Sequence, residues 1–236
     1  MPADTDKPLQ PEHLDRVDLG LALLAIGAGS MDALGFFALG GALPSAMTGN
    51  TALLGLALGQ GHFAAAAPPL AAGIGFVLGA ALATALLQLC LARLPAHRAA
   101  GWLLALEAAL LAGFLLLWLL SGGPPSGAGL YVLILLGAGG MGVQSVAARQ
   151  DDRPGITTVV FTSTLTAIVI ALTKALLAKP HRLGFAAKRQ LFVYLGYALG
   201  AIAGGILTWS GIEAMAVIPP AATLGALGLH LAARRS

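Results

Sequence analysis

The sequence predicts an all-α membrane protein with several crossings, and three observations predict this class. Of the 236 residues, 58% are hydrophobic and only 10% are charged, whereas a soluble domain is about 25% charged. Apolar runs recur along the chain at about the 20 residues that a helix needs to cross a bilayer. The runs lack the alternation of a membrane β-barrel. We therefore expect a multi-pass protein of a bacterial inner membrane, surrounded by the lipid bilayer.

Eight apolar segments account for most of the chain. In order, they span residues 17–38, 46–60, 67–93, 100–121, 127–147, 157–178, 189–209 and 212–233. The tail of residues 1–16 holds four acidic residues and three prolines, so we expect it to be disordered and cytoplasmic. Residues 17–236 are expected to form a single membrane domain.

Short stretches in the first half resemble stretches in the second half. The pairs are GAGSMDAL (27–34) with GAGGMGVQ (137–144), TGNTALLGLAL (48–58) with TSTLTAIVIAL (162–172), and GFVLGAALA (75–83) with GYALGAIAG (196–204). Their offsets of 110, 114 and 121 rise in order, as differences in loop length would produce. We predict a duplication, with one repeat over about 17–121 and the other over about 127–233.

Basic residues in the loops predict which ends of the segments face the cytoplasm. They gather near the ends of the third and sixth segments and at the C-terminal end of the chain. These residues are Arg93, Arg98, Lys174, Lys179, Arg182, Lys188, Arg189, Arg234 and Arg235. The loops after the second, fourth and seventh segments have no Lys or Arg. The third and seventh segments then run in opposite directions, so the repeats are inverted, as in many secondary transporters. Both termini are predicted to be cytoplasmic.

The same charges limit the segments at 46–60 and 157–178. Segment 127–147 is long enough to cross alone, so segment 157–178 should begin and end inside, as a re-entrant hairpin or one arm of a broken helix. By inversion, segment 46–60 dips in from outside. We predict six transmembrane helices plus two re-entrant or broken segments. The alternative of eight full crossings would place the basic cluster at 174–189 outside.

Polar residues at the start of each dipping segment form the main candidate site. They are Thr48, Gly49 and Asn50 in the first repeat, with Thr162, Ser163 and Thr164 as counterparts. Irregular backbone at membrane depth is tolerated only where protein buries it or water reaches it. The N–H groups at a helix start can hold an anion or a polar solute. The alternative is that these side chains only cap helices and fill packing gaps.

Asp32 is the sharpest single candidate, because it lies in the middle of the first segment with glycines around it. A carboxylate at that depth is costly, and it normally marks an ion path, a proton relay or an ion pair. In the repeat alignment its counterpart is Gly142, so the charge is not duplicated. The alternative is a structural hydrogen bond to a helix end.

Glu107 and Gln144 are weaker candidates inside the apolar segments. Glu107 is expected either to pair with Arg98 or to face the bundle, where it would support the site. Gln144 lies among small residues near the inner end of its segment and joins the binding candidates. The four-residue glycine spacing of segments 67–93 and 189–209 predicts that these two helices form a central packed pair.

Several kinds of chemistry find no support. Cys90 is the single cysteine, so there is no intrachain disulfide, and no Cys/His cluster has metal spacing. We find no nucleophile, phosphate-loop or metalloprotease motif, and we predict no cofactor, no metal and no nucleic-acid partner. An Asp151–Asp152 pair leaves a lipid-acting enzyme as the least favoured alternative.

At these residues the sequence resembles the YoaK-like family of bacterial membrane proteins, over nearly the whole chain after the tail. The resemblance rests on AGSMDALGFFALGG, TGN, GMGVQ and TTVVFTSTLT, which hold Asp32, Thr48, Gly49, Asn50, Gly142 and Gln144. The second hydroxyl motif departs from the family's usual Thr-Gly-Thr at Ser163. The resemblance implies about six transmembrane helices and brings no settled substrate.

We therefore predict a small-solute transporter or channel with its polar site between the two repeats. Asp32 would carry a proton or bind a cationic group, and Thr48, Asn50 and the helix start would bind a polar or anionic part. The main alternative is a non-transporting scaffold or binding protein. The substrate, the coupling ion and the formation of a homo-oligomer stay open.

Overall fold

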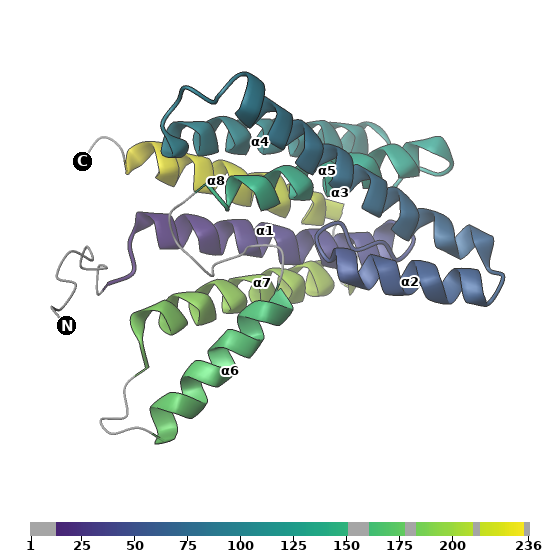
Figure 1. Cartoon of the computed structure of the whole chain (residues 1–236). Coiled ribbons are helices and arrows are strands. Elements are labelled where there is room, and N and C mark those ends of the chain that lie inside the picture. Colours follow the sequence, from purple (N-terminus) through teal and green to yellow (C-terminus); the bar gives the residue numbers. More distant parts are fainter. Residues whose placement is uncertain (1–12, 151–160, 178–182, 210–212, 234–236) are drawn as a thin grey trace, which may run out of the picture.

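The computed structural model describes residues 13–150, 161–177, 183–209 and 213–233 (Figure 1). These residues form eight α-helices and a short 3-10 helix, η1, and none of them is in a strand. The helices are α1 (Arg16–Ala38), α2 (Met47–Gly59), α3 (Phe63–Leu89), α4 (Ala96–Leu120), α5 (Ala128–Ala147), α6 (Phe161–Leu177), α7 (Phe185–Trp209), η1 (Glu213–Val217) and α8 (Ile218–Ala232). Six of the described helices are long and apolar enough to cross a membrane, which confirms the predicted class.

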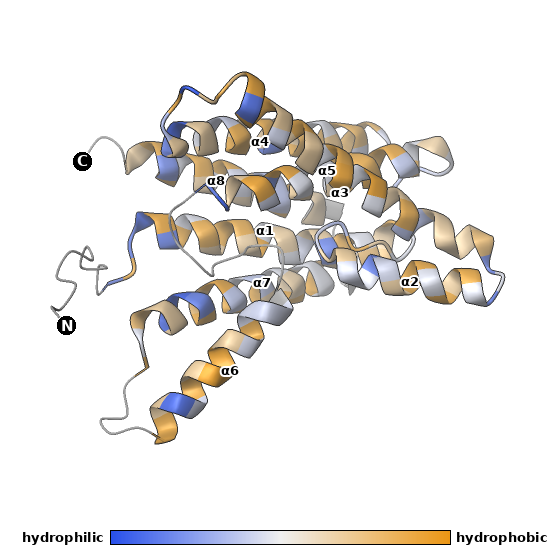
Figure 2. Cartoon of the chain, viewed as in Figure 1, coloured by the Kyte–Doolittle hydropathy of each residue, from blue (hydrophilic) through white to orange (hydrophobic). Residues whose placement is uncertain are grey.

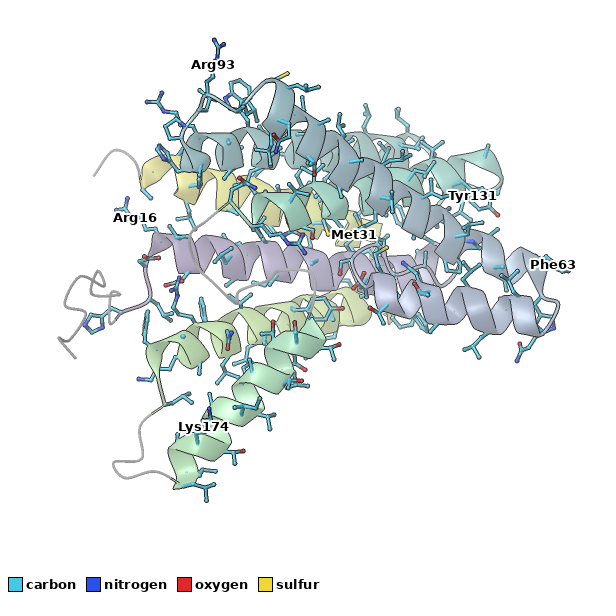
Figure 3. The ribbon with its side chains drawn as sticks, in the orientation of Figure 1. Arg16, Met31, Phe63, Arg93, Tyr131 and Lys174 are labelled. Carbon is cyan, nitrogen blue, oxygen red and sulfur yellow. The ribbon has the colours of Figure 1, made fainter. Side chains whose placement is uncertain are left out.

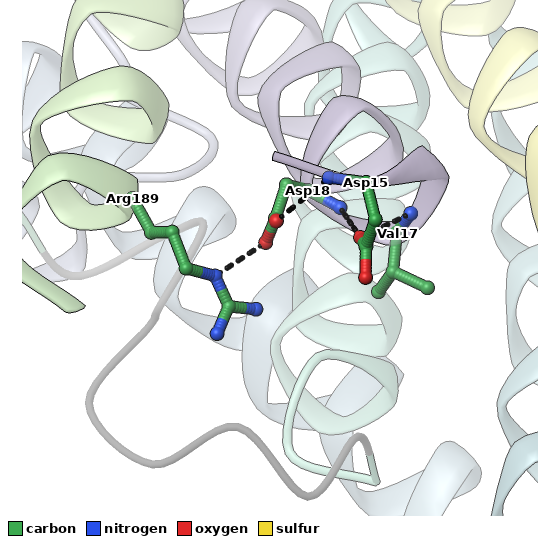
Figure 4. Close-up of polar contacts among 4 residues, drawn as sticks. All are labelled: Asp15, Val17, Asp18 and Arg189. Carbon is green, nitrogen blue, oxygen red and sulfur yellow. Dashed lines mark hydrogen bonds and ion pairs between the residues drawn. The ribbon is translucent and has the colours of Figure 1, made fainter. Parts of the chain in front are cut away.

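The first helix begins with a capping box. Asp15 is the N-cap, and its Oδ1 accepts hydrogen bonds from the backbone N–H groups of Val17 (2.9 Å) and Asp18 (3.0 Å), while the Asp15 N–H donates to Asp18 Oδ2 (3.1 Å; Figure 4). Asp18 also forms a buried ion pair with Arg189 Nε at 2.6 Å, which ties α1 to α7. Residues 15 and 16 thus belong to α1, and residues 1–12 of the predicted tail lie outside the described residues.

Glycines set the two closest helix pairs, α1 with α7 and α3 with α5. A Cβ added at Gly79 on α3 would collide with the carbonyl oxygen of Gly139 on α5, and one added at Gly200 on α7 would collide with that of Ile26 on α1. Small residues allow this backbone approach. The expectation that the glycine stripes of α3 and α7 face each other is therefore wrong for the described chain, because each stripe receives the backbone of a different helix.

Two helices, α2 and α6, are not among the six spans, whereas α8 reaches spanning length together with residues of η1, as the 18-residue segment Met215–Ala232. The α2 helix has 13 residues and α6 has 17, which at 1.5 Å per residue gives lengths of about 20 and 26 Å. Figure 1 shows that α2 lies beside the first part of α3 and that α6 diverges from the bundle next to α7. Six spans plus two shorter segments are what the loop charges predict.

Prolines begin α8 rather than kinking it. Pro219 and Pro220 occupy its first positions, directly after the 3-10 helix Glu213–Val217. Proline is tolerated there because the first N–H groups of a helix have no intrahelical acceptor. Pro219 and Pro220 therefore mark the start of α8 and do not interrupt it.

The two ends of the bundle differ in polarity. Hydrophilic residues concentrate at the end where α1 starts (Figure 2). Arg16, Arg93 and Lys174 lie at this end, whereas Phe63 and Tyr131 lie at the other (Figure 3). Of the basic residues on which the predicted orientation depends, Lys179, Arg182, Arg234 and Arg235 lie outside the residues that the structure describes.

Candidate functional site

The segment after α1 folds back along the helix that precedes it. Residues 39–46 leave the end of α1 and return as far as Asp32, where the backbone N–H of Ser45 donates to Asp32 Oδ1 at 2.7 Å. Gly35 makes this possible, because a Cβ there would collide with the Ala42 carbonyl and the Pro44 ring. Asp32 is six residues before the last residue of α1, so α2 starts about 9 Å inward from that end.

Asp32 is the centre of a buried hydrogen-bond cluster. Its side chain is 4% exposed. Oδ2 accepts hydrogen bonds from Ser45 Oγ at 2.6 Å and from the Tyr197 hydroxyl of α7 at 2.7 Å. Short bonds to a carboxylate are strong, so this cluster joins α1, the fold-back segment and α7.

Asn50 holds the same fold-back segment, residues 39–46, through the backbone of Leu43. Its Oδ1 accepts from the Leu43 N–H at 2.9 Å, and its Nδ2 donates to the Leu43 carbonyl at 2.6 Å. The side chain is 2% exposed. Asn50 therefore satisfies both backbone groups of a residue in non-helical chain, which is the condition for such chain inside a membrane.

A polar cavity of about 470 Å³ lies in front of the Asp32 cluster. Thr48 and Gly49 line it from the first turn of α2, and Thr162 lines it from the first turn of α6. The remaining lining residues are Ser45, Ala46, Met47, Phe76, Ala80, Ser145, Arg149 and Tyr197. The structure thus brings together the starts of both short helices, which are more than 100 residues apart in the sequence.

Other predicted site residues lie away from this cavity. Gln144 is fully buried, and its Nε2 donates to the Leu24 carbonyl at 2.9 Å. Glu107 faces the bundle rather than Arg98 and accepts from Thr223 Oγ1 of α8 at 2.8 Å. Thr164 is buried and Ser163 is exposed, and neither lines the cavity.

Comparison with known proteins places the chain in a family. The family described as "Protein of unknown function (DUF1275)" matches residues 20–230. The chain belongs to the DUF1275 family. A DUF1275 relative, the UPF0700 transmembrane protein YoaK of Bacillus subtilis (strain 168), is 34% identical over 185 residues, which cover 77% of this chain and 80% of the relative. No solved structure matches significantly.

Four residues of this DUF1275 chain belong to the site but were not predicted from the sequence as site residues. They are Ser45, Tyr197, Ser145 and Arg149. Arg149 Nη1 donates to the Ser145 carbonyl at 3.1 Å and to Ser145 Oγ at 3.0 Å. The only sequence signal for Tyr197 is a phenol inside the glycine stripe of α7, and Arg149 stands beside the charged residues Asp151, Asp152 and Arg153, a pattern typical of a solvated loop.

Possible metal ligands do not cluster in the part of the chain that the structure describes. No group of three or more His, Cys, Asp or Glu side chains among them could hold a metal ion. Asp151 and Asp152, the acidic pair weighed for lipid chemistry, lie outside the residues that the structure describes.

Proposed function

We propose that this membrane protein is a small-solute transporter or channel whose polar site lies between two inverted repeats. The observation that carries the proposal is the cavity of about 470 Å³ lined by the first turns of both α2 and α6. Its volume falls within the range of about 300–1,000 Å³ that is usual for small-molecule sites. Hydroxyls, helix-start N–H groups and one guanidinium converge on it.

Repeated contacts support the duplication. A Cβ at Gly29 of α1 would collide with the Tyr197 carbonyl of α7, and a Cβ at Gly142 of α5 would collide with the Phe76 carbonyl of α3. The two glycines are 113 positions apart, and Phe76 and Tyr197 are 121 positions apart. The Gly200–Ile26 and Gly79–Gly139 contacts are related by the same two offsets, because Ile26 and Gly139 are 113 positions apart and Gly79 and Gly200 are 121 positions apart. A Cβ at Gly113 of α4 would contact Leu136, and a Cβ at Gly225 of α8 would contact Leu23. The offset between α4 and α8 is therefore 112. This list of contacts is what two copies of one packing unit would produce.

The contact register differs from the sequence alignment by one helical turn. An offset of 113 pairs Asp32 with Ser145, whereas the alignment at 110 pairs it with Gly142. The counterpart of Tyr197 is then Phe76. The polar cluster of the first repeat therefore faces Ser145 and Phe76 across the cavity, and the site is chemically asymmetric although its scaffold is repeated.

The proposed orientation places both termini in the cytoplasm of a bacterial inner membrane. Arg16, at the start of α1, lies at the same end as Arg93 and Lys174, and Tyr131, near the start of α5, lies at the opposite end (Figure 3). Basic residues favour the cytoplasmic side. In this orientation α1 and α5 run in opposite directions, as inverted repeats require.

Flux into proteoliposomes tests the proposal. The probes are radiolabelled L-amino acids, short carboxylates and sugars, and the variants Thr48→Trp and Thr162→Trp fill the cavity from either side. We expect uptake of at least one probe class by the wild type and its loss in both variants. Thr84→Trp is the control, because Thr84 is exposed on α3 and does not line the cavity. Wild-type uptake equal to that of empty liposomes contradicts the proposal.

A scaffold or binding role is the second candidate, and the saturation of Asp32 and Asn50 by local hydrogen bonds favours it. In that case these residues only hold the fold. A ligand that binds the native state raises its stability, so a scaffold without a solute site should show no stabilisation with any probe. The lipid-acting enzyme stays a hypothesis, tested by the membrane lipid profile after Asp151→Asn and Asp152→Asn.

A further inference from the structure

One wall of the cavity presents hydrogen-bond acceptors. Ser45 Oγ and the Tyr197 hydroxyl both line the cavity, and both donate their protons to Asp32 Oδ2, at 2.6 and 2.7 Å. A hydroxyl has one proton and two acceptor lone pairs. With its proton directed at Asp32, each hydroxyl acts toward other groups as an acceptor, and the nearby Asp32 carboxylate adds negative potential.

The other wall presents donors and a positive charge. Arg149 is the charged residue among those that line the cavity. One of its terminal nitrogens, Nη1, donates to the Ser145 carbonyl and hydroxyl, which leaves further N–H groups of a five-donor fork for a ligand. Arginine stays protonated and matches a carboxylate with two parallel bonds.

The cavity therefore has two chemically opposite walls. We propose that its solute is a small zwitterion with an ammonium and a carboxylate group, such as an α-amino acid. The ammonium faces Ser45 and Tyr197, and the carboxylate faces Arg149. Met47, Phe76 and Ala80 supply the apolar part of the lining, against which a short side chain packs. This inference rests on the proposed function, because it names the substrate class of the same site.

Thermal stability of the purified full-length protein in detergent tests the inference. The screen uses the protein-forming L-amino acids. Each amino acid that stabilises the protein is compared with its two half-analogues, which for L-alanine are isobutyrate and isopropylamine. We expect the zwitterion to raise the melting temperature severalfold more than either half-analogue at equal concentration, because each half-analogue leaves one wall unpaired.

Two variants locate the walls. Arg149→Gln and Tyr197→Phe should each weaken binding of the zwitterion at least tenfold, and Arg149→Gln should affect the carboxylate half-analogue more than the amine. Arg93→Gln is the matched control, since Arg93 is exposed and does not line the cavity; it should bind as the wild type does.

The other outcomes overturn either the inference or the proposed transport function. Equal stabilisation by a carboxylate alone identifies an anion site, and equal stabilisation by an amine alone identifies a cation site. No stabilisation of the wild type by any L-amino acid rejects the substrate class. Stabilisation without proteoliposome uptake of the same amino acid supports the inference and rejects transport, so the two failures are distinguishable.

Discussion

At the scale of single residues, buried polar groups in this protein find partners on distant segments. Asp32 reaches Ser45 and Tyr197, the latter 165 positions away. Glu107 reaches Thr223 on α8. Such groups are costly in an apolar interior unless they are hydrogen-bonded, and this cost gives single substitutions a measurable effect.

Asp32→Asn should lower the free energy of unfolding by about 1–3 kcal/mol, because the amide group replaces one acceptor of the cluster by a donor. Asp32→Ala should cost more, since it leaves the Ser45 and Tyr197 donors without an acceptor. Reversible unfolding in mixed micelles measures both. Gln60→Ala is the control, because Gln60 is exposed at the end of α2. An Asp32→Asn protein as stable as the wild type would remove the structural role assigned to this carboxylate.

Glu107 is fully buried, and among the residues that the structure describes no Lys or Arg forms an ion pair with it. Its Oε2 has no hydrogen-bond partner there. Glu107→Gln keeps an acceptor for Thr223 and replaces a buried ionisable carboxyl by a neutral amide of nearly the same size, so we expect stability equal to or above the wild type. Glu107→Ala should cost about 2–4 kcal/mol through a cavity and an unpaired Thr223 hydroxyl. Equal losses in both variants would mean that the native state needs the ionised carboxylate.

At the scale of elements, the position of a glycine rather than its presence decides how helices pack. Gly79 faces the backbone of α5, whereas a Cβ at Gly73, six residues earlier on the same helix, would meet open space. The sequence pattern of small residues identified α3 and α7 as packing helices. It did not identify their partners, because any helix with a small-residue face could have filled the role.

Gly79→Ala should lower the free energy of unfolding by about 2–3 kcal/mol, because the added methyl group collides with the Gly139 carbonyl and the helices have to separate. Gly73→Ala should leave it unchanged or raise it by up to about 1 kcal/mol through helix propensity. The two substitutions are chemically identical and lie on one helix, so the difference between their unfolding curves isolates the contact. A destabilisation shared equally by both would contradict the α3–α5 packing.

At the scale of the whole molecule, the unequal distribution of charge between the two ends predicts the orientation in the membrane. Lys174 lies at the end that also holds Arg16 and Arg93 (Figure 3). Gln60 follows α2 and precedes Phe63, which lies at the opposite end. The difference in charge between the two ends is a property of the assembled bundle, since helices from both halves of the chain contribute to each end.

Cysteine accessibility in intact cells measures this orientation. In a Cys90→Ala background, a membrane-impermeant thiol reagent added from outside should label Gln60→Cys and leave Lys174→Cys unlabelled until the membrane is permeabilised. The reason is that the basic end is retained in the cytoplasm. In the protein that retains it, the native Cys90, exposed at the end of α3, should likewise stay unlabelled until the membrane is permeabilised. Labelling of Lys174→Cys from outside would contradict the predicted orientation. It would favour either the reverse orientation or eight full crossings.

The sequence by itself determined the class, the six spans and the two short segments, because hydropathy and loop charge are local properties that the bilayer reads along the chain. It also singled out Asp32, Thr48, Gly49 and Thr162 as site candidates, since polar groups stand out in an apolar chain, and the structure places them at or beside one cavity. Only the tertiary structure decided that Ser45 and Tyr197 complete the Asp32 cluster and that Arg149 lines the cavity. Helices rich in Ala, Gly and Leu present nearly equivalent faces, so a shift of one turn changes little in hydrophobicity, and the register is set by backbone contacts that form only when the helices pack.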